Sequence, residues 1–478
     1  MEHPDKWPSA VTRVMIPKPN VELRDRVPIR SFLLPQAPES RRHAASACRL
    51  QPLHPRLRDA LRRQRKMGAA LPGSAREYVI DFVGWLLMLR LRRCAAVMID
   101  VREDAEVDLA SLLTGGAPIR RTQSFKAIAA HLDAEVAVDP REIAALGTLS
   151  AEVYALPDDE AAADALASLW RKRLAIADTD DDDAARADAA VRSAHWRGLS
   201  AIAHRHSRWS GVFTPDTDPD SYARSLSGLV ARLGQPPEAA PQRGDREGRT
   251  MLPRPAGSGV NDLLRGRATC RNFDRGRPLP LEVAASLLHG VFGAQHAVTV
   301  PAGAEVLKKL SPSGGGLHPT EAYVLALDIA GLAPGFWHYR SKDHALDPVR
   351  MMPAAELREF ALRALAGQDW FADAPMLVVH ACRFERSFWK YRQHAKAYRA
   401  VILDIGHLSQ TAYLLATELG LGAFVTAAIN EADLERVLGL DPMREGPLAI
   451  SGFGYRSAAQ THPEFDPAHA VWERDGEA

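Results

Sequence analysis

Residues 308–321 read Lys-Lys-Leu-Ser-Pro-Ser-Gly-Gly-Gly-Leu-His-Pro-Thr-Glu and lead into an apolar run at 322–327. Three consecutive glycines can adopt positive φ, which lets backbone N–H groups approach a bound anion or a flat ring. The apolar run predicts a buried strand directly after the turn. Taken alone, such a turn is most often a flexible connection, so its role depends on the sequence around it.

Composition and charge are typical of a soluble globular protein with two or three domains. The chain has 478 residues, of which 46% are hydrophobic and 25% charged, and its net charge of +1 gives no electrostatic basis for binding nucleic acid. The longest apolar stretch, 82–89, is too short to span a bilayer, and residues 1–20 lack the apolar core of a signal peptide. We therefore expect neither nucleic acid nor a membrane among the partners.

The four cysteines are scattered without a Cys-x-x-Cys pair, which argues against a disulfide framework and a zinc site. Free thiols fit a reducing compartment, so we expect a cytoplasmic protein without a bound metal.

The acidic run 178–183 predicts a solvated loop before a helix. His204 and His206 have no third ligand at a suitable spacing. With Trp196 they predict a packed, partly exposed helix, and contact with a substrate peptide is the alternative.

The N-terminal half divides into an extension and a small domain. Residues 1–87 are rich in Pro, Arg and His without a sustained period, which predicts a poorly ordered extension. Because Met88 opens a good strand pattern, the alternative is that the native protein starts near that residue. Residues 88–233 predict a smaller, mostly helical, winged-helix-like domain for peptide binding or dimerisation. Its expected elements are a strand at 89–101, helices at 109–113, 124–132 and 140–145 with Asp139 as a cap, and a turn at 115–116.

The clearest linker in the chain follows this domain. Residues 234–254 combine Pro, Gly and charged residues without a hydrophobic period, so they contribute nothing to a core. We place the domain boundary in this segment and the chemistry in residues 255–478.

The second domain opens with an arginine-rich segment. Arg267, Thr269 and Arg271 alternate in an extended stretch that can clamp a phosphate, although arginine-rich surface segments are common. An amphipathic helix at 280–292 leads toward the glycine turn. Beyond the turn we expect a hairpin from 336–339 and 346–349, a strand at 376–381, one long helix at 387–419 with Tyr391 and Tyr398 on one face and 401–403 buried, and strands at 423–428 and 448–456.

The order of these patterns resembles the FMN-dependent nitroreductase superfamily. More narrowly, it resembles the SagB-type and McbC-type dehydrogenases, which oxidise azolines to azoles in ribosomally made, thiazole/oxazole-modified peptides. The resemblance covers roughly 255–458 and implies an α+β fold, in which a mainly antiparallel central sheet is flanked by helices in a dimeric protein. It rests on Arg-x-Thr-x-Arg-x-Phe at 267–273, on 311–323 with the glycine turn, and on Trp-Lys-Tyr at 389–391 leading to Asp-x-Gly-His-x-x-Gln at 404–410.

The same resemblance implies FMN as the cofactor. Arg267, Thr269 and Arg271 would hold its phosphate and ribityl oxygens. Family members usually carry Ser where Thr269 stands, which keeps the hydroxyl, whereas Ala268 replaces a commonly polar neighbour. The other residues that the resemblance places at the flavin are Ala268, Pro312, Ser313, Gly314, Gly315, Leu317, His318, Thr426, Ala427 and Arg456.

Making an aromatic azole removes one hydrogen as a hydride and another as a proton, so the reaction needs a base beside the flavin. Lys390 and Tyr391 resemble the Lys-Tyr pair of the azoline dehydrogenases, which implies that they are the catalytic residues; an exposed helix start is the alternative. No Gly-x-Gly-x-x-Gly dinucleotide fingerprint is present.

The partners implied by the resemblance are a precursor peptide as substrate, a second copy in a homodimer and a cyclodehydratase complex. Two other functions stay open. One is a generic NAD(P)H-dependent flavin nitroreductase acting on small molecules. The other is a non-catalytic peptide-binding scaffold of a maturation complex.

Overall fold

The computed structural model describes residues 89–107, 113, 119–156, 162–218, 221–240, 248–253, 257–466 and 469–472. The expected N-terminal extension, the turn at 115–116 and all but the last residue of the helix expected at 109–113 lie outside these ranges. No helix within them is long and apolar enough to cross a membrane.

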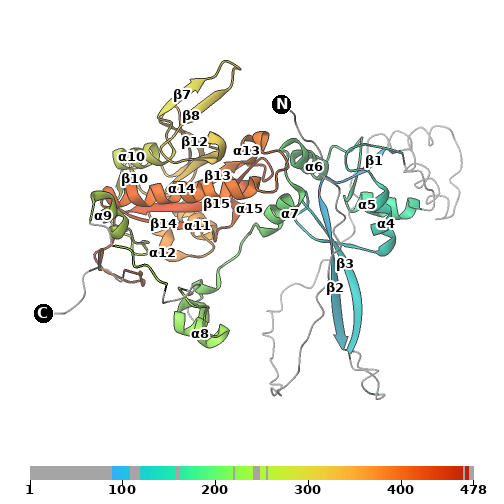
Figure 1. The fold of residues 1–478 in the computed structure, drawn as a ribbon, viewed down its shortest axis with the longest axis horizontal. Helices are drawn as coiled ribbons and strands as arrows, with labels where there is room; N and C mark the ends of the chain where they lie inside the picture. The colour runs from blue at the N-terminus through green and yellow to red at the C-terminus, as the bar shows by residue number, and fades with distance from the viewer. Residues whose placement is uncertain are drawn as a thin grey trace. The chain divides into compact units, whose positions relative to one another are not determined.

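The N-terminal half combines a long hairpin with short helices (Figure 1). A three-stranded antiparallel sheet has the order β2-β3-β4, and a separate pair joins β1 to β5. Its elements are β1 (Leu91–Arg93), β2 (Val97–Val107), β3 (Ile119–Ala129), β4 (Val136–Val138), α4 (Pro140–Thr148), α5 (Ala163–Arg171), β5 (Ala175–Ala177), α6 (Asp183–Ser193), α7 (Gly198–Ser207), two 3-10 turns (Pro215–Thr217 and Tyr222–Arg224) and α8 (Leu226–Leu233).

The helix predicted at 124–132 was wrong, because residues 124–129 belong to β3 and pair with β2, and the chain turns directly after Ala129. The end of β3 is buried on both faces. Ala127 and Ala129 pack into one hydrophobic cluster, while Ile128 and Ala130 pack into another. A strand covered on both faces carries apolar residues at consecutive positions, so its spacing resembles that of a helix. The strand expected at 89–101 is also interrupted, between β1 and β2.

The helix starts in this half agree with the predictions. Asp139 caps α4, and its side chain accepts from the backbone N–H groups of Arg141 and Glu142 in a capping box. Within the acidic run, Asp182 caps α6, and its side chain accepts from Ala185 N. The segment 234–240 has no secondary structure and is exposed throughout. A domain boundary at 234–254 stays a prediction.

The C-terminal half is built around a six-stranded sheet of order β12-β11-β9-β13-β15-β14, in which every neighbouring pair is antiparallel. The expected α+β class, with a mainly antiparallel central sheet flanked by helices, is confirmed. Its elements are α9 (Gly259–Gly266), β6 (Leu279–Pro280), α10 (Leu281–Phe292), β7 (His296–Thr299), β8 (Glu305–Lys308), β9 (Thr320–Ala326), β10 (Ile329–Ala330), β11 (Gly335–Arg340), β12 (Ala345–Met351), α11 (Ala354–Ala364), α12 (Asp369–Ala372), β13 (Met376–Arg383), α13 (Phe384–Lys390), α14 (Ala397–Glu418), β14 (Gly422–Thr426), α15 (Glu431–Leu438) and β15 (Glu445–Gly454).

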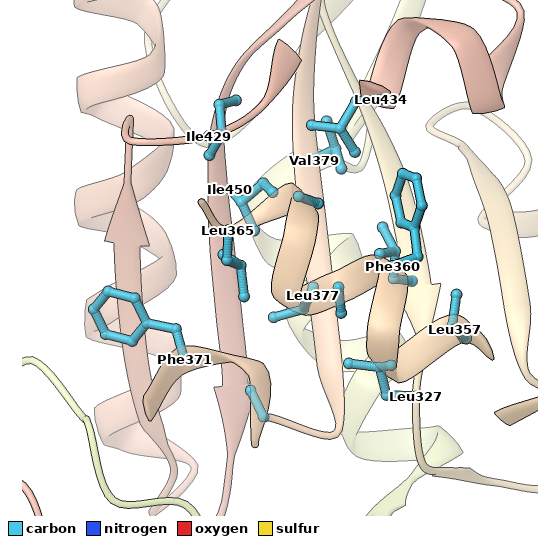
Figure 2. Close-up of a cluster of buried hydrophobic side chains, with 14 of the residues drawn as sticks. Leu327, Leu357, Phe360, Leu365, Phe371, Leu377, Val379, Ile429, Leu434 and Ile450 are labelled. Atoms are coloured by element: carbon cyan, nitrogen blue, oxygen red, sulfur yellow. The ribbon is translucent and has the colours of Figure 1, made fainter. Parts of the chain in front are cut away.

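Helices cover both faces of this sheet. Leu377 and Val379 of β13 point into a cluster with α11, α12 and α15, which Figure 2 shows. Their neighbours Met376 and Val378 point to the other face and pack with α10 and α14. The central strand therefore alternates between two cores, as a strand buried on both faces must.

The single helix predicted at 387–419 was wrong, because the chain forms α13 and α14 with a break at 391–396. Gln393 adopts φ = 50° within the break, which is incompatible with a continuous right-handed helix. Tyr391 and Tyr398 therefore do not share one helix face. The prediction that 401–403 is buried holds for Val401 alone, since Ile402 and Leu403 are 47% and 60% exposed.

Candidate functional site

The glycine turn adopts the backbone that its sequence predicts. Gly314–Gly316 forms one 3-10 turn, in which Gly315 and Gly316 have φ of 66° and 69°. His318 is also left-handed, with φ = 47°, although it has a side chain. A non-glycine residue in this region carries strain and persists only where the surroundings hold it. The turn is thus a fixed structure and not a flexible connection.

Asp404 of α14 holds the turn in place. Its carboxylate accepts from Ser313 Oγ at 2.6 Å and from Gly314 N at 2.8 Å. Ser313 Oγ in turn accepts from His318 N at 2.9 Å, which ties the two ends of the turn together. Asp404 is 5% exposed, so these bonds are shielded from water. The sequence pattern assigned no role to Asp404, because its contact with the turn depends on which side of α14 faces the turn.

Lys390 and Tyr391 reach the outer surface of the turn. A Cβ built on Gly315 would lie 2.6 Å from Tyr391 Oη and 2.7 Å from Lys390 Nζ. The two polar ends therefore meet over one glycine, and only glycine leaves them room. The structure brings together the two predicted catalytic residues and the predicted Gly315, although about 75 residues separate them in the chain.

A second group gathers around Tyr413 of α14. Thr269 pairs with Ala423 of β14, and its Oγ1 lies 3.1 Å from Tyr413 Oη. The Arg267 guanidinium stands 5.2 Å from the centre of the Tyr413 ring, and Val425 N donates to Tyr413 Oη at 3.2 Å. Tyr413 was missed at the sequence level. Its spacing within an apolar helix gave no signal beyond that of a core residue.

The arginines around Tyr413 differ in whether their charge is already paired within the protein. Arg456 donates to Ala268 O at 2.7 Å and forms an ion pair with the buried Glu464. Its charge is therefore largely compensated within the protein. In the described ranges, by contrast, no carboxylate pairs with the guanidinium of Arg267 or Arg271. These two remain the side chains best suited to an added anion.

Thr426 is the last residue of β14, the strand that carries Ala423, and Ala427 follows it. Thr426 Oγ1 donates to Gln368 Oε1 at 3.3 Å and accepts from Ala428 N at 3.2 Å, while Ala427 is exposed. They extend the Tyr413 group along β14.

The two groups lie on opposite sides of α14. Asp404 and Tyr413 are nine residues apart in this helix, which is two and a half turns and about 13 Å of axial rise. The glycine turn with Lys390 and Tyr391 thus belongs to one face of the helix. The segment with Arg267, Thr269 and Arg271 belongs to the other. One copy of the chain gathers the predicted site residues into two groups.

Behind the turn lies a small pocket, lined by Lys309, Pro312, Ser313, His318, Pro319, Thr320, Asp404 and Leu408. Burial lowers the pKa of His318 to about 4, and the charge of Lys309 adds to the shift, so the imidazole is neutral near pH 7. Burial also lowers the pKa of Lys309. Leu317 is buried, and its carbonyl accepts from Arg386 Nε at 2.7 Å. In the part of the chain that the structure describes, no group of His, Cys, Asp and Glu could hold a metal ion.

Comparison with known proteins finds relatives of two kinds, nitroreductases and peptide-processing proteins. The sequence model of the nitroreductase family matches residues 264–455. A Methanocaldococcus jannaschii protein that is named as a nitroreductase is 30% identical over 195 residues, which are 41% of this chain and 90% of that protein.

Two other relatives are named for peptide processing. The trifolitoxin-processing protein TfxB of Rhizobium leguminosarum bv. trifolii is 35% identical over 185 residues, which are 36% of this chain and 47% of TfxB. The microcin B17-processing protein McbC of Escherichia coli is 28% identical over 149 residues, which are 30% of this chain and 53% of McbC. The match thus spans about half the length of each processing protein. Among solved structures, a chain of the E. coli microcin synthetase McbBCD complex with truncated pro-MccB17 aligns with a TM-score of 0.40 and 20% identity, covering 56% of this chain and 97% of that one.

Proposed function

This chain belongs to the nitroreductase family, and from that premise we propose that it is an FMN-dependent dehydrogenase that oxidises azoline rings to azoles in a ribosomally synthesised precursor peptide. The observation that carries the proposal is the meeting of Lys390 Nζ and Tyr391 Oη over Gly315. Dehydrogenation of a ring requires a protein base at the cofactor, and this pair can provide one. The names of TfxB and McbC as peptide-processing proteins support a peptide substrate.

The residues present fit FMN. Arg267 and Arg271 offer two guanidinium groups to a phosphate, and the hydroxyl of Thr269 stands between them in the chain. On the glycine turn, the missing side chain of Gly315 leaves room for Lys390 Nζ and Tyr391 Oη beside the proposed flavin site. Bound FMN supplies the acceptor for the hydride that leaves the azoline. The proposed flavin contacts of Ala268, Pro312, Ser313, Gly314, Leu317, His318, Thr426, Ala427 and Arg456 rest on the family resemblance.

In this proposal Tyr391 takes the proton that leaves the ring carbon. The ammonium of Lys390 shares the space over Gly315 with Tyr391 Oη, so a positive charge stands beside the oxygen that accepts the proton in this proposal. Asp404 keeps the turn beneath the pair in one conformation through Ser313 and Gly314. The protein's part is thus to hold a base in a fixed place.

A homodimer would bring the two groups of site residues together. They lie on opposite sides of α14 in one copy, and the same helix exposes Ile402 and Leu403. Burying such residues against a second copy removes apolar surface from water. We propose that each flavin site combines the Tyr413 group of one copy with the glycine turn of the other.

The proposed reaction also defines its neighbours. An azoline forms when a peptide side chain closes on the preceding carbonyl with loss of water, so a cyclodehydratase has to supply the substrate. We propose such an enzyme and the precursor peptide as the partners, in the cytoplasm.

The test of the proposed function is an absorbance spectrum of the purified protein, followed by mass spectrometry of an azoline-containing peptide. We expect bound flavin and a loss of two hydrogens, about 2 Da, per ring. Flavin binding without any mass change contradicts the proposed reaction.

A second candidate function is a nitroreductase that uses NAD(P)H. It is favoured by the M. jannaschii relative, which is matched over 90% of its length and named as a nitroreductase. Rapid oxidation of NAD(P)H in the presence of a nitroaromatic compound, with no activity on the azoline peptide, supports this function instead.

We expect Arg267→Ala to weaken FMN binding by about 10- to 150-fold, because one hydrogen bond to a charged phosphate contributes about 1.5–3 kcal/mol. The matched control is Arg265→Ala, two residues earlier, whose guanidinium forms an exposed ion pair with Asp262. Fluorescence titration of the flavin-free protein with FMN measures both affinities. Equal affinities for the two variants contradict the assignment of Arg267 to the phosphate.

A further inference from the structure

The segment that joins α13 to α14 is irregular. Within residues 391–396, His394 N donates to Tyr391 O at 3.1 Å, and His394 accepts from Lys396 N at 3.2 Å and from Ala397 N at 3.0 Å. These local bonds replace the regular ladder of a helix, so the position of the segment also depends on contacts from elsewhere in the chain.

One of those contacts comes from the N-terminal half. Gln393 N donates to His195 O at 2.9 Å, across nearly 200 residues of sequence. Both residues are left-handed, with φ of 50° and 59°. A side chain in this region costs about 1–2 kcal/mol per residue. Two such residues facing each other across one hydrogen bond indicate that the surroundings impose this geometry.

The next residue, Trp196, packs on the helix that ends in the catalytic pair. Its ring centre lies 4.8 Å from that of Phe384 and 4.7 Å from that of Phe388, both in α13. Its Nε1 donates to Met443 O at 2.7 Å, which fixes the orientation of the buried indole. Trp196 thus sets the position of α13 before the break.

His204 performs the equivalent task after the break. It is buried, and its Nε2 lies 2.9 Å from Pro442 O, which can only accept, so Nε2 carries the hydrogen. Nδ1 is then an acceptor and receives the hydroxyl of Tyr398 at 3.1 Å, near the start of α14. Burial lowers the pKa of His204 to about 3, so this neutral arrangement persists across the usual pH range.

Residues 195–204 therefore contact the catalytic segment before, within and after its break. We propose that His195, Trp196 and His204, which we call the 195–204 clamp, are positioning residues that hold Lys390 and Tyr391 over Gly315. The inference rests on the proposed function for its catalytic meaning. In this proposal the N-terminal half positions the catalytic residues, which is a different role from binding the substrate peptide.

The first test compares His204→Ala with His206→Ala. His206 lies on the same helix, but it faces the N-terminal hairpin, where its Nε2 contacts Ala129 O at 3.0 Å. We expect His204→Ala to keep FMN and KM while lowering kcat by about 10- to 100-fold, the effect of a displaced catalytic group. His206→Ala should retain the wild-type kcat. If His204→Ala binds FMN and retains kcat, the proposal is wrong. If it loses flavin and fold together, His204 is a structural residue and the proposal is likewise wrong for it.

A second test follows the position of Tyr391 itself. Gln393→Gly keeps both the positive φ and the N–H that donates to His195 O, whereas Gln393→Pro removes both. With 3-fluorotyrosine incorporated at position 391, the fluorine resonance should be the same in wild type and Gln393→Gly. It should shift or broaden in Gln393→Pro and in His204→Ala. An unchanged resonance in both latter variants overturns the proposal. This readout needs no substrate, so it separates failure of the clamp from failure of the proposed dehydrogenation.

Discussion

Tyr391→Phe is expected to lower kcat for peptide dehydrogenation by about 10²- to 10⁴-fold, the contribution typical of a positioned acid or base. The substitution removes one oxygen, which the structure places over Gly315 beside Lys390 Nζ, and leaves the ring in place. FMN should stay bound, because the arginine-rich segment lies on the other side of α14. Stopped-flow reduction of the bound flavin by the azoline peptide measures the step directly.

The matched control for this variant is Tyr455→Phe. Tyr455 presents its ring to the Arg277 guanidinium at 3.3 Å, and Phe retains that contact. Lys390→Ala should also slow flavin reduction, because the remaining phenol lacks a neighbouring positive charge. A Tyr391→Phe enzyme that reduces its flavin at the wild-type rate would falsify the role of Tyr391 as the base.

Gly315→Ala is expected to abolish most of the activity at a small loss of stability. A methyl group at this position would lie 2.6 Å from Tyr391 Oη and 2.7 Å from Lys390 Nζ, both at the ends of side chains that can swing aside. The pair therefore moves instead of the backbone, and the base leaves its position. A displacement of about 1 Å at a reacting centre can cost about 100-fold in rate.

The control for Gly315→Ala is its neighbour. Gly316 has nearly the same φ, 69° against 66°, but within the described residues a Cβ there meets no atom within 4 Å. Both alanine variants should lose about 1–2 kcal/mol from the free energy of unfolding, because each forces a side chain into the left-handed region. Only Gly315→Ala should lose activity. Equal kcat values in the two variants contradict a role for the space over Gly315.

The sequence allowed the central sheet and the glycine turn to be predicted because both depend on local patterns. Residues 322–326 of the apolar run lie in β9, and Gly315 and Gly316 took the positive φ that glycine adopts freely. The break after Lys390 could not be predicted, since one of the contacts made within it is a hydrogen bond to His195. A local period carries no information about a partner almost 200 residues away.

The candidate site was predictable in its residue types but not in its arrangement. Lys390, Tyr391 and Gly315 were identified by resemblance, yet nothing in the sequence indicated that their atoms meet. Asp404 belongs to the motif at 404–410 but was given no role, and Tyr413 looks like an ordinary position of a long helix. Their function follows from the rotation of α14, which places one toward the glycine turn and the other toward Thr269. That rotation is set by packing against α10 and the sheet.

The two faces of α14 have a consequence for genetics. In the proposed dimer, each site takes the Arg267 segment from one copy and Tyr391 from the other. The substitution Arg267→Ala damages the first part of a site, and Tyr391→Phe damages the second part. When the two copies pair with each other, both lesions fall in one site and the other site is intact. Mixed subunits should then regain up to about a quarter of the wild-type sites, although each parent carries a lesion in every site. If one copy carried a whole site, mixing would restore nothing, so a cell that expresses both defective alleles reports directly on how the site is shared.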